Sequence, residues 1–114
     1  MSVSANVQKH EWVPEGYTEY FIVIFYKGVE WGVRKRYSDF VKFDDYLRSQ
    51  GYKLTCKLTG KNFWNRYDPT LITQRVGELQ TYLNHLLSST MTDNNLIKEF
   101  LEVDENMLKQ AKLM

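Results

Sequence analysis

The sequence has little cysteine and histidine, and it has no long apolar run. Its 114 residues include a single cysteine, Cys56, which excludes an internal disulfide and a zinc site made of several thiolates. The two histidines, His10 and His85, lie far apart and form no HExxH-like pattern, so no metal or other cofactor is expected. The longest apolar run, from Tyr20 to Tyr26, is too short to span a bilayer.

These absences also bear on where the protein works. A single cysteine suits a reducing, intracellular compartment. Residues 1–12 contain no apolar segment of signal-peptide length. We therefore expect a cytoplasmic protein whose contact with membranes is peripheral.

The composition is that of a globular domain, with a basic middle. Hydrophobic residues make up 43%, charged residues 25% and aromatic residues a high 15%. Residues 27–66 contain ten Lys and Arg against four Asp and Glu, a net charge of +6, whereas residues 1–26 carry −2 and residues 67–114 carry −3. This asymmetry predicts an anionic partner for the middle third of the chain.

The first half of the chain has the pattern of a small antiparallel sheet. Residues 17–26 are rich in Tyr, Phe, Ile and Val and are apolar on both faces, which predicts a strand buried on both sides. A turn at Lys27 and Gly28 leads to the alternating residues 29–37, so the two segments form a β-hairpin. Residues 3–7 could add a weak edge strand, followed by a loop over residues 10–16.

The second half has helical patterns. Ser38 is the expected N-cap of a helix that ends at Gly51, and Asp68 and Pro69 begin a long helix over residues 69–87. A short helix capped by Thr92 or Asp93 and a last helix over 105–114 follow. We therefore expect one α+β domain spanning residues 1–114, in which a three-stranded antiparallel sheet packs against a helical subdomain and residues 1–5 form a loose tail.

No arrangement of residues suggests an enzyme. Gly60 and Lys61 lack the other residues of a phosphate-binding loop, and Cys56 has no histidine near it in the sequence to act as a base. Asp44 and Asp45 lie on a predicted helix beside basic residues and are expected on its solvated face.

The segment RKRYSDF, residues 34–40, stands out instead. Arg34 and Arg36 project from one face at the end of a strand, next to a helix N-terminus whose free N–H groups favour anions. An arginine can hold two phosphate oxygens at once, and the flat ring of Tyr37 could support a sugar-like ring. The alternative is a strand end with solvated basic residues and a buried tyrosine.

This segment resembles the signature of the phox-homology (PX) domain, a phosphoinositide-binding module. QRVGELQTYLNHLL (74–87) and NLIKEFLEV (95–103) are similar to the arginine-led helix and the closing helix of that family. The resemblance covers nearly the whole chain. It implies binding of phosphatidylinositol 3-phosphate and recruitment of a protein to endosomal or vacuolar membranes, as in the sorting nexins.

The resemblance also implies a role for individual residues. Arg36 matches the arginine that holds the 3-phosphate, Tyr37 the aromatic on which the inositol ring stacks, and Arg75 the arginine that binds the ring hydroxyls. Lys57, or failing that Lys61, takes the place of the lysine that contacts the 1-phosphate. The prolines that precede this lysine in the family are missing, because residues 54–57 read Leu-Thr-Cys-Lys.

Four further residues are candidates for insertion into the membrane. Phe63 and Trp64 lie between basic residues, and Trp12 and Val13 precede Pro14 in the expected loop between the first strands. Trp suits the bilayer interface because it has an apolar body and a polar edge. The alternative is that these side chains cover the core.

The sequence leaves one alternative function open. A PX-fold module with weak or altered lipid binding could instead bind a protein of the sorting or trafficking machinery, and the changed loop favours that alternative. Nucleic-acid binding is not expected, because no recognised motif is present and the chain as a whole is close to neutral. The domain is expected to be monomeric.

Overall fold

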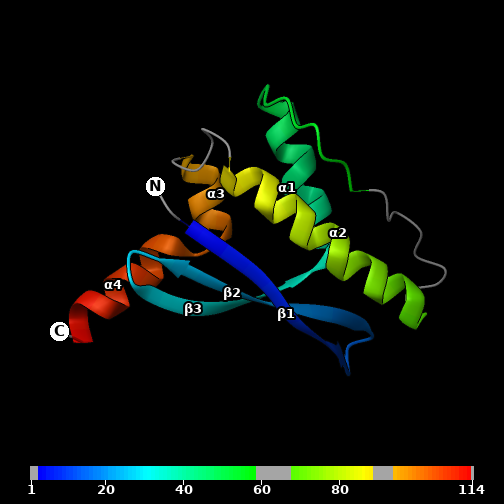
Figure 1. The fold of residues 1–114 in the computed structure, drawn as a ribbon, viewed down its shortest axis with the longest axis horizontal. Coiled ribbons are helices and arrows are strands. Elements are labelled where there is room, and N and C mark those ends of the chain that lie inside the picture. Colours follow the sequence, from blue (N-terminus) through cyan, green and yellow to red (C-terminus); the bar gives the residue numbers. More distant parts are fainter. Residues whose placement is uncertain (1–2, 59–67, 89–93, 114) are drawn as a thin grey trace.

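The computed structural model describes residues 3–58, 68–88 and 94–113. Three strands, β1 (Val3–Val13), β2 (Tyr17–Tyr26) and β3 (Val29–Arg36), form an antiparallel sheet in the order β1-β2-β3 (Figure 1). Four helices follow: α1 (Tyr37–Ser49), α2 (Pro69–Ser88), α3 (Asn95–Phe100) and α4 (Val103–Leu113). This arrangement confirms the predicted α+β fold.

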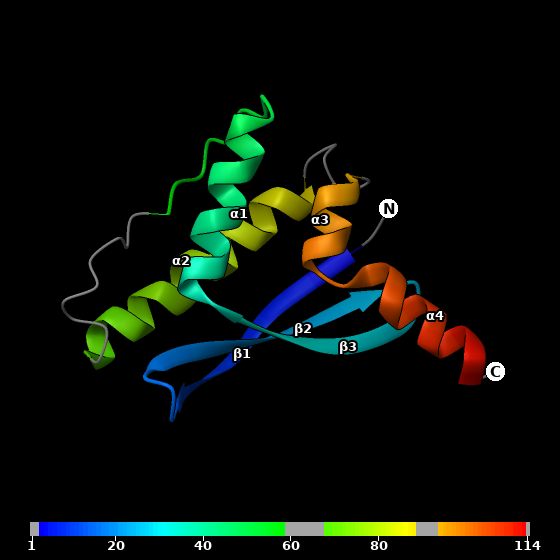
Figure 2. The same cartoon turned by 180° about the vertical axis from the view of Figure 1, so that it is seen from behind.

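The helices lie on one side of the sheet. Figures 1 and 2 show α1, α2 and α3 over one face of the strands, and α4 beside the end where β2 turns into β3. The edge strand β1 is tied to α2 by Gln80, whose side chain accepts a hydrogen bond from Val7 N–H at 2.8 Å and donates one to the carbonyl of Ala5 at 2.8 Å. These bonds supply backbone partners beside the irregularity between Val7 and Lys9, where the register of β1 against β2 shifts.

The core fills the space between the sheet and the helices. Its fully buried side chains come from β2, α1, α2, α3 and Leu101, the residue after α3. They are Tyr20, Ile22, Ile24, Phe40, Leu47, Leu79, Tyr82, Leu83, Ile97 and Leu101. Trp31 of β3 closes the core at the far end, where its indole N–H donates to the carbonyl of Leu101 at 2.9 Å. Strand alternation and helical spacing thus place their apolar residues on the faces that meet.

The prediction that β2 is buried on both sides was wrong. Its side chains alternate between buried and partly exposed, and Phe25 on the outer face is 49% exposed. No helix of the described chain covers that face (Figures 1 and 2). Phe21 lies there over Gly32, with the amine of Lys9 5.2 Å and the guanidinium carbon of Arg34 5.3 Å from its ring centre. These two cations cover part of the aromatic surface.

Several boundaries also differ from those expected. β1 is a full strand that begins at Val3 and continues through His10 to Val13, because it pairs with β2 on both sides of the register shift. Residues 3–5 are therefore part of the sheet, and the expectation of a loose tail over residues 1–5 was wrong for them. α1 begins at Tyr37 with Arg36 as its N-cap, and α3 is capped by Asn94, whose side chain accepts from Leu96 N–H at 2.7 Å. The structure confirms three expectations: the turn at Lys27 and Gly28, the end of α1 before Gly51, and the long helix α2.

Candidate functional site

Arg36 is the last residue of β3 and lies where the chain enters α1. Its backbone N–H donates to a side-chain oxygen of Asp39 at 2.7 Å, which fixes the first turn of the helix. Its exposed guanidinium lies over the ring of Tyr17, with 3.9 Å between the guanidinium carbon and the ring centre. No carboxylate in the described part of the chain forms an ion pair with it. Arg36 is therefore held in position by an aromatic face and keeps its charge available to an anion.

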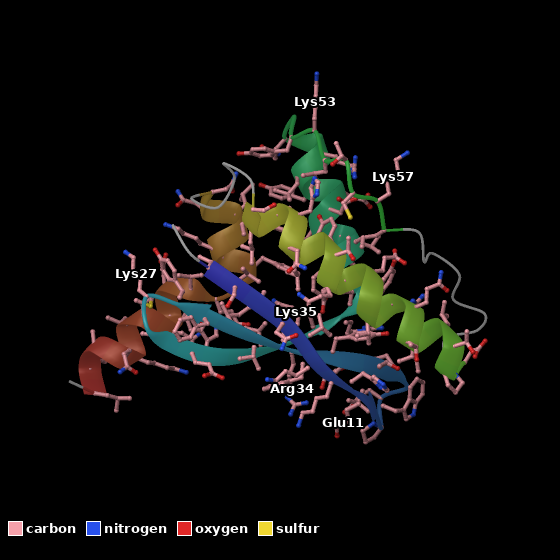
Figure 3. The ribbon with its side chains drawn as sticks, in the orientation of Figure 1. Glu11, Lys27, Arg34, Lys35, Lys53 and Lys57 are labelled. Carbon is pink, nitrogen blue, oxygen red and sulfur yellow. The ribbon has the colours of Figure 1, made fainter. Side chains whose placement is uncertain are left out.

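The two basic residues before Arg36 are already paired. Arg34 lies near Glu11 at 3.4 Å and Glu19 at 3.7 Å, on the side of the sheet away from the helices (Figure 3). Lys35 points to the opposite side, 3.9 Å from a carboxylate oxygen of Glu102 and 4.5 Å from the centre of the Phe100 ring. The strand therefore presents three neighbouring cations in three different settings, of which that of Arg36 is the most open to a new anionic partner.

Tyr37, the residue after Arg36, is in contact with Arg75. Tyr37 is the first residue of α1, and the guanidinium carbon of Arg75, from α2, lies 4.2 Å from the centre of its ring. The Tyr37 hydroxyl donates to a carboxylate oxygen of Glu78 at 2.7 Å. The junction of β3, α1 and α2 thus brings the predicted residues Tyr37 and Arg75 into contact. Arg36 precedes Tyr37 in the chain, and its guanidinium lies over Tyr17.

The face of Tyr37 on which an inositol ring was expected to stack is covered in this structure. Tyr37 is 5% exposed and Arg75 is 7% exposed. Burial raises the pKa of the Tyr20 hydroxyl, and the guanidinium of Arg75 nearby offsets only part of the increase. A ring that stacks on Tyr37 would therefore have to replace the guanidinium of Arg75 on its face.

Lys57 lies in a different setting. It is exposed at the end of the described part of the α1–α2 connection, and in Figure 3 its amine points outward. It lines a groove along α1 with Val41, Asp44, Asp45, Arg48 and Leu58, and neither Arg36 nor Arg75 lines that groove. The other lysine candidate, Lys61, lies outside the described residues. The role of Lys57 in lipid binding stays a prediction, because its described surroundings do not include Arg36 or Arg75.

The path of the loop that carries Lys57 is fixed by Arg48. Its guanidinium donates to the carbonyls of Leu54 at 3.1 Å and Cys56 at 2.9 Å. These bonds hold two backbone carbonyls of the segment that lacks the prolines expected from the resemblance.

Asp44 orients Arg48, and the prediction that Asp44 is solvated was wrong. The spacing had suggested a solvated carboxylate, but Asp44 is buried. One of its oxygens accepts from Arg48 Nε at 2.9 Å and the other from the hydroxyl of Tyr82 at 2.9 Å. The available signal was the i,i+4 spacing of Asp44 and Arg48, which places the two side chains on one face of the helix. Asp45, one residue on, is exposed as expected.

The buried Tyr82 hydroxyl predicts a loss of stability in alkaline solution. Burial raises the pKa of Tyr82, and the Asp44 carboxylate raises it further. The unfolded chain releases this proton near pH 10, whereas the folded protein keeps it, so stability is complete below about pH 10 and falls as the pH rises beyond it. The expected slope is about 1.4 kcal/mol per pH unit for this group. Urea unfolding between about pH 8 and pH 11 measures it.

A Tyr82→Phe variant isolates this contribution. It removes the titrating hydroxyl and keeps the ring. The slope of the unfolding free energy against pH above about pH 10 should therefore become shallower by the contribution of one titrating proton. An unchanged slope in the variant would mean that other groups cause the alkaline loss.

The candidates for membrane insertion have different outcomes. Trp12 is 41% exposed near the β1–β2 turn and remains a prediction. Val13 is wrong as an inserting residue, because it is only 8% exposed and pairs with Tyr17 across the sheet. Phe63 and Trp64 lie outside the described residues. Among the helices of the described chain, none is long and apolar enough to cross a membrane.

Comparisons with known proteins bear on the family and the fold. The sequence model of the PX domain matches residues 24–104, which is more than half of the chain. The fold is similar to that of the X-ray structure of a designed CISK-PX domain, with a TM-score of 0.77, 22% sequence identity, and coverage of 85% of this chain and 96% of that one. No curated protein sequence matches the chain. The RKRYSDF segment, the three-stranded sheet and the helices after it, together with the match over residues 24–104, place this chain in the PX-domain family.

Proposed function

We propose that this domain binds phosphatidylinositol 3-phosphate and recruits its protein to endosomal or vacuolar membranes. Membership of the PX-domain family implies phosphoinositide binding and peripheral association with membranes in general. The proposal that the bound lipid is phosphatidylinositol 3-phosphate depends mainly on Arg36. This residue is exposed, lies over Tyr17 and forms no ion pair within the described residues. A 3-phosphate would enter next to the N-terminus of α1, whose N–H groups add to the attraction.

The other residues would then act on the inositol ring. The ring would stack on Tyr37, and Arg75 would move from that face to the ring hydroxyls. Hydrogen bonds that involve a charged group contribute about 1.5–3 kcal/mol each, so a few of them give reversible binding. Arg75 already lies within reach of this position, since its guanidinium carbon is 4.2 Å from the Tyr37 ring centre.

Contact with the bilayer would come from the end of the molecule that carries the β1–β2 turn and the beginning of α2. Figures 1 and 2 show the β1–β2 turn and the beginning of α2 at one end of the fold. Trp12 lies beside that turn and is 41% exposed. Phe63 and Trp64 precede α2 in the sequence, and basic residues near an anionic surface add about 1 kcal/mol each.

Titration with vesicles tests the proposed lipid. Each vesicle carries one phosphoinositide, either mono- or bis-phosphorylated, at the same molar fraction in phosphatidylcholine. We expect the tightest binding to vesicles with phosphatidylinositol 3-phosphate. Equal binding to all phosphoinositides in proportion to their charge would contradict the proposed specificity.

A second candidate function has its own observation. Tyr37 and Arg75 are buried, and an aromatic surface lies elsewhere, between α1 and α3. There Phe43 and Phe100 stack with their ring centres 4.2 Å apart, and Tyr46 is 48% exposed beside them. This surface favours a module that binds a protein of the sorting or trafficking machinery. Absence of any phosphoinositide preference in the vesicle titration would favour it over the lipid proposal.

A further inference from the structure

We propose that Glu78 makes the headgroup pocket selective for an inositol ring that carries a single monoester phosphate, because its carboxylate repels a second one. This inference rests on the proposed function, since it concerns the same pocket. It assigns a specificity role to a residue outside the RKRYSDF segment and outside the pair of arginines.

Glu78 is held at the pocket by its contacts. It follows Arg75 by three positions on α2, so the two side chains are neighbours on one face of the helix. One of its carboxylate oxygens accepts a hydrogen bond from the Tyr37 hydroxyl at 2.7 Å. Arg75 covers the ring of the same tyrosine. A ring that takes the place of Arg75 on Tyr37 therefore lies close to a carboxylate that Tyr37 itself keeps in position.

The chemistry of that carboxylate separates hydroxyls from phosphates. An ionised carboxylate only accepts hydrogen bonds, so it can receive them from inositol hydroxyls. A monoester phosphate offers no donor when fully ionised and carries a charge of about −1.5 to −2 near pH 7. Repulsion between the two is strong in a partly buried place, where the effective dielectric constant is far below that of water.

The charge balance of the pocket points the same way. Arg36 and Arg75 supply two positive charges, and Glu78 removes one. Among the described residues, Arg34 and Lys35 are paired with carboxylates, and Lys57 lines a separate groove. The described residues of the pocket thus suit one monoester phosphate and leave little positive charge for a second.

The Glu78→Gln variant tests the inference. It removes the charge and keeps an oxygen that accepts from Tyr37. We expect the affinity for phosphatidylinositol 3-phosphate to change by less than about threefold, and that for the 3,4- or 3,5-bisphosphate to rise by about tenfold or more. Vesicle binding is measured together with binding of soluble short-chain phosphatidylinositol 3-phosphate and of its 3,4- and 3,5-bisphosphate counterparts, in which the 1-phosphate remains a diester; these ligands remove the general attraction of a charged membrane.

Glu105→Gln is the matched control, because it removes the same charge from an exposed position on α4. A bisphosphate-to-monophosphate ratio that stays at the wild-type value in Glu78→Gln, or that rises equally in Glu105→Gln, overturns the inference. If Glu78→Gln does not fold, Tyr37→Phe provides the test, since it removes the hydrogen bond that holds the carboxylate at the ring and should reduce the discrimination. An unchanged ratio there also counts against the inference.

The Arg36→Gln variant separates the two proposals. If it binds phosphatidylinositol 3-phosphate as tightly as the wild type, the proposed site is wrong and the inference fails with it. If it loses binding while Glu78→Gln keeps the wild-type ratio, only the inference about Glu78 fails. If no phosphoinositide binds to the wild type but a bisphosphate binds to Glu78→Gln, the repulsion by Glu78 is supported.

Discussion

The Arg36→Gln variant should lose binding to vesicles with phosphatidylinositol 3-phosphate by about 100-fold or more. The change removes two or more charge-assisted hydrogen bonds of about 1.5–3 kcal/mol each, and about 1.4 kcal/mol corresponds to a factor of ten. The fold should persist, because the Arg36 side chain is exposed and its described side-chain contact is with Tyr17. Vesicle co-sedimentation measures the binding, and thermal unfolding checks the fold.

Arg34→Gln is the control that matches this change in charge. Arg34 is two residues earlier on the same strand, and its guanidinium lies near Glu11 and Glu19. We therefore expect a loss of less than about fivefold, from the weaker general attraction to an anionic surface. Equal losses in the two variants would indicate that the membrane attracts the basic strand as a whole and that no specific phosphate site exists at Arg36.

The parts of the fold that could be predicted are those whose pattern is complete within one segment. The hairpin follows from apolar strand residues on either side of Lys27 and Gly28, and α2 from its apolar row after Pro69. The length of β1 could not be predicted, because its outer residues are polar and it becomes a strand by pairing with β2. The open outer face of β2 depends on where the helices pack, which its own residues do not determine.

The site divides in the same way. Arg36 and Tyr37 are adjacent, so the motif alone indicates them, and the family resemblance adds Arg75. The stack of Arg75 on Tyr37 and the bond from Tyr37 to Glu78 join positions 38 and 41 residues apart and depend on how α2 crosses α1. The burial of Asp44 likewise depends on Tyr82, from another helix.

The Asp44→Ala variant should lower the free energy of unfolding by about 3 kcal/mol. It leaves the buried Tyr82 hydroxyl without its acceptor and deprives Arg48 of the carboxylate that orients it. For a domain of this size, the midpoint of thermal unfolding should fall by about 10 °C. Differential scanning calorimetry and urea unfolding measure the two quantities.

Asp45→Ala is the matched control, since it makes the same substitution at the exposed neighbour on α1 and includes the higher helix propensity of alanine. We expect its stability to stay within about 0.5 kcal/mol of the wild type. A similar loss in both variants would mean that the network of Tyr82, Asp44 and Arg48 contributes no more than ordinary surface charge. A loss confined to Asp44→Ala would mean that this network, which also holds the carbonyls of Leu54 and Cys56 through Arg48, stabilises the fold beyond ordinary surface charge.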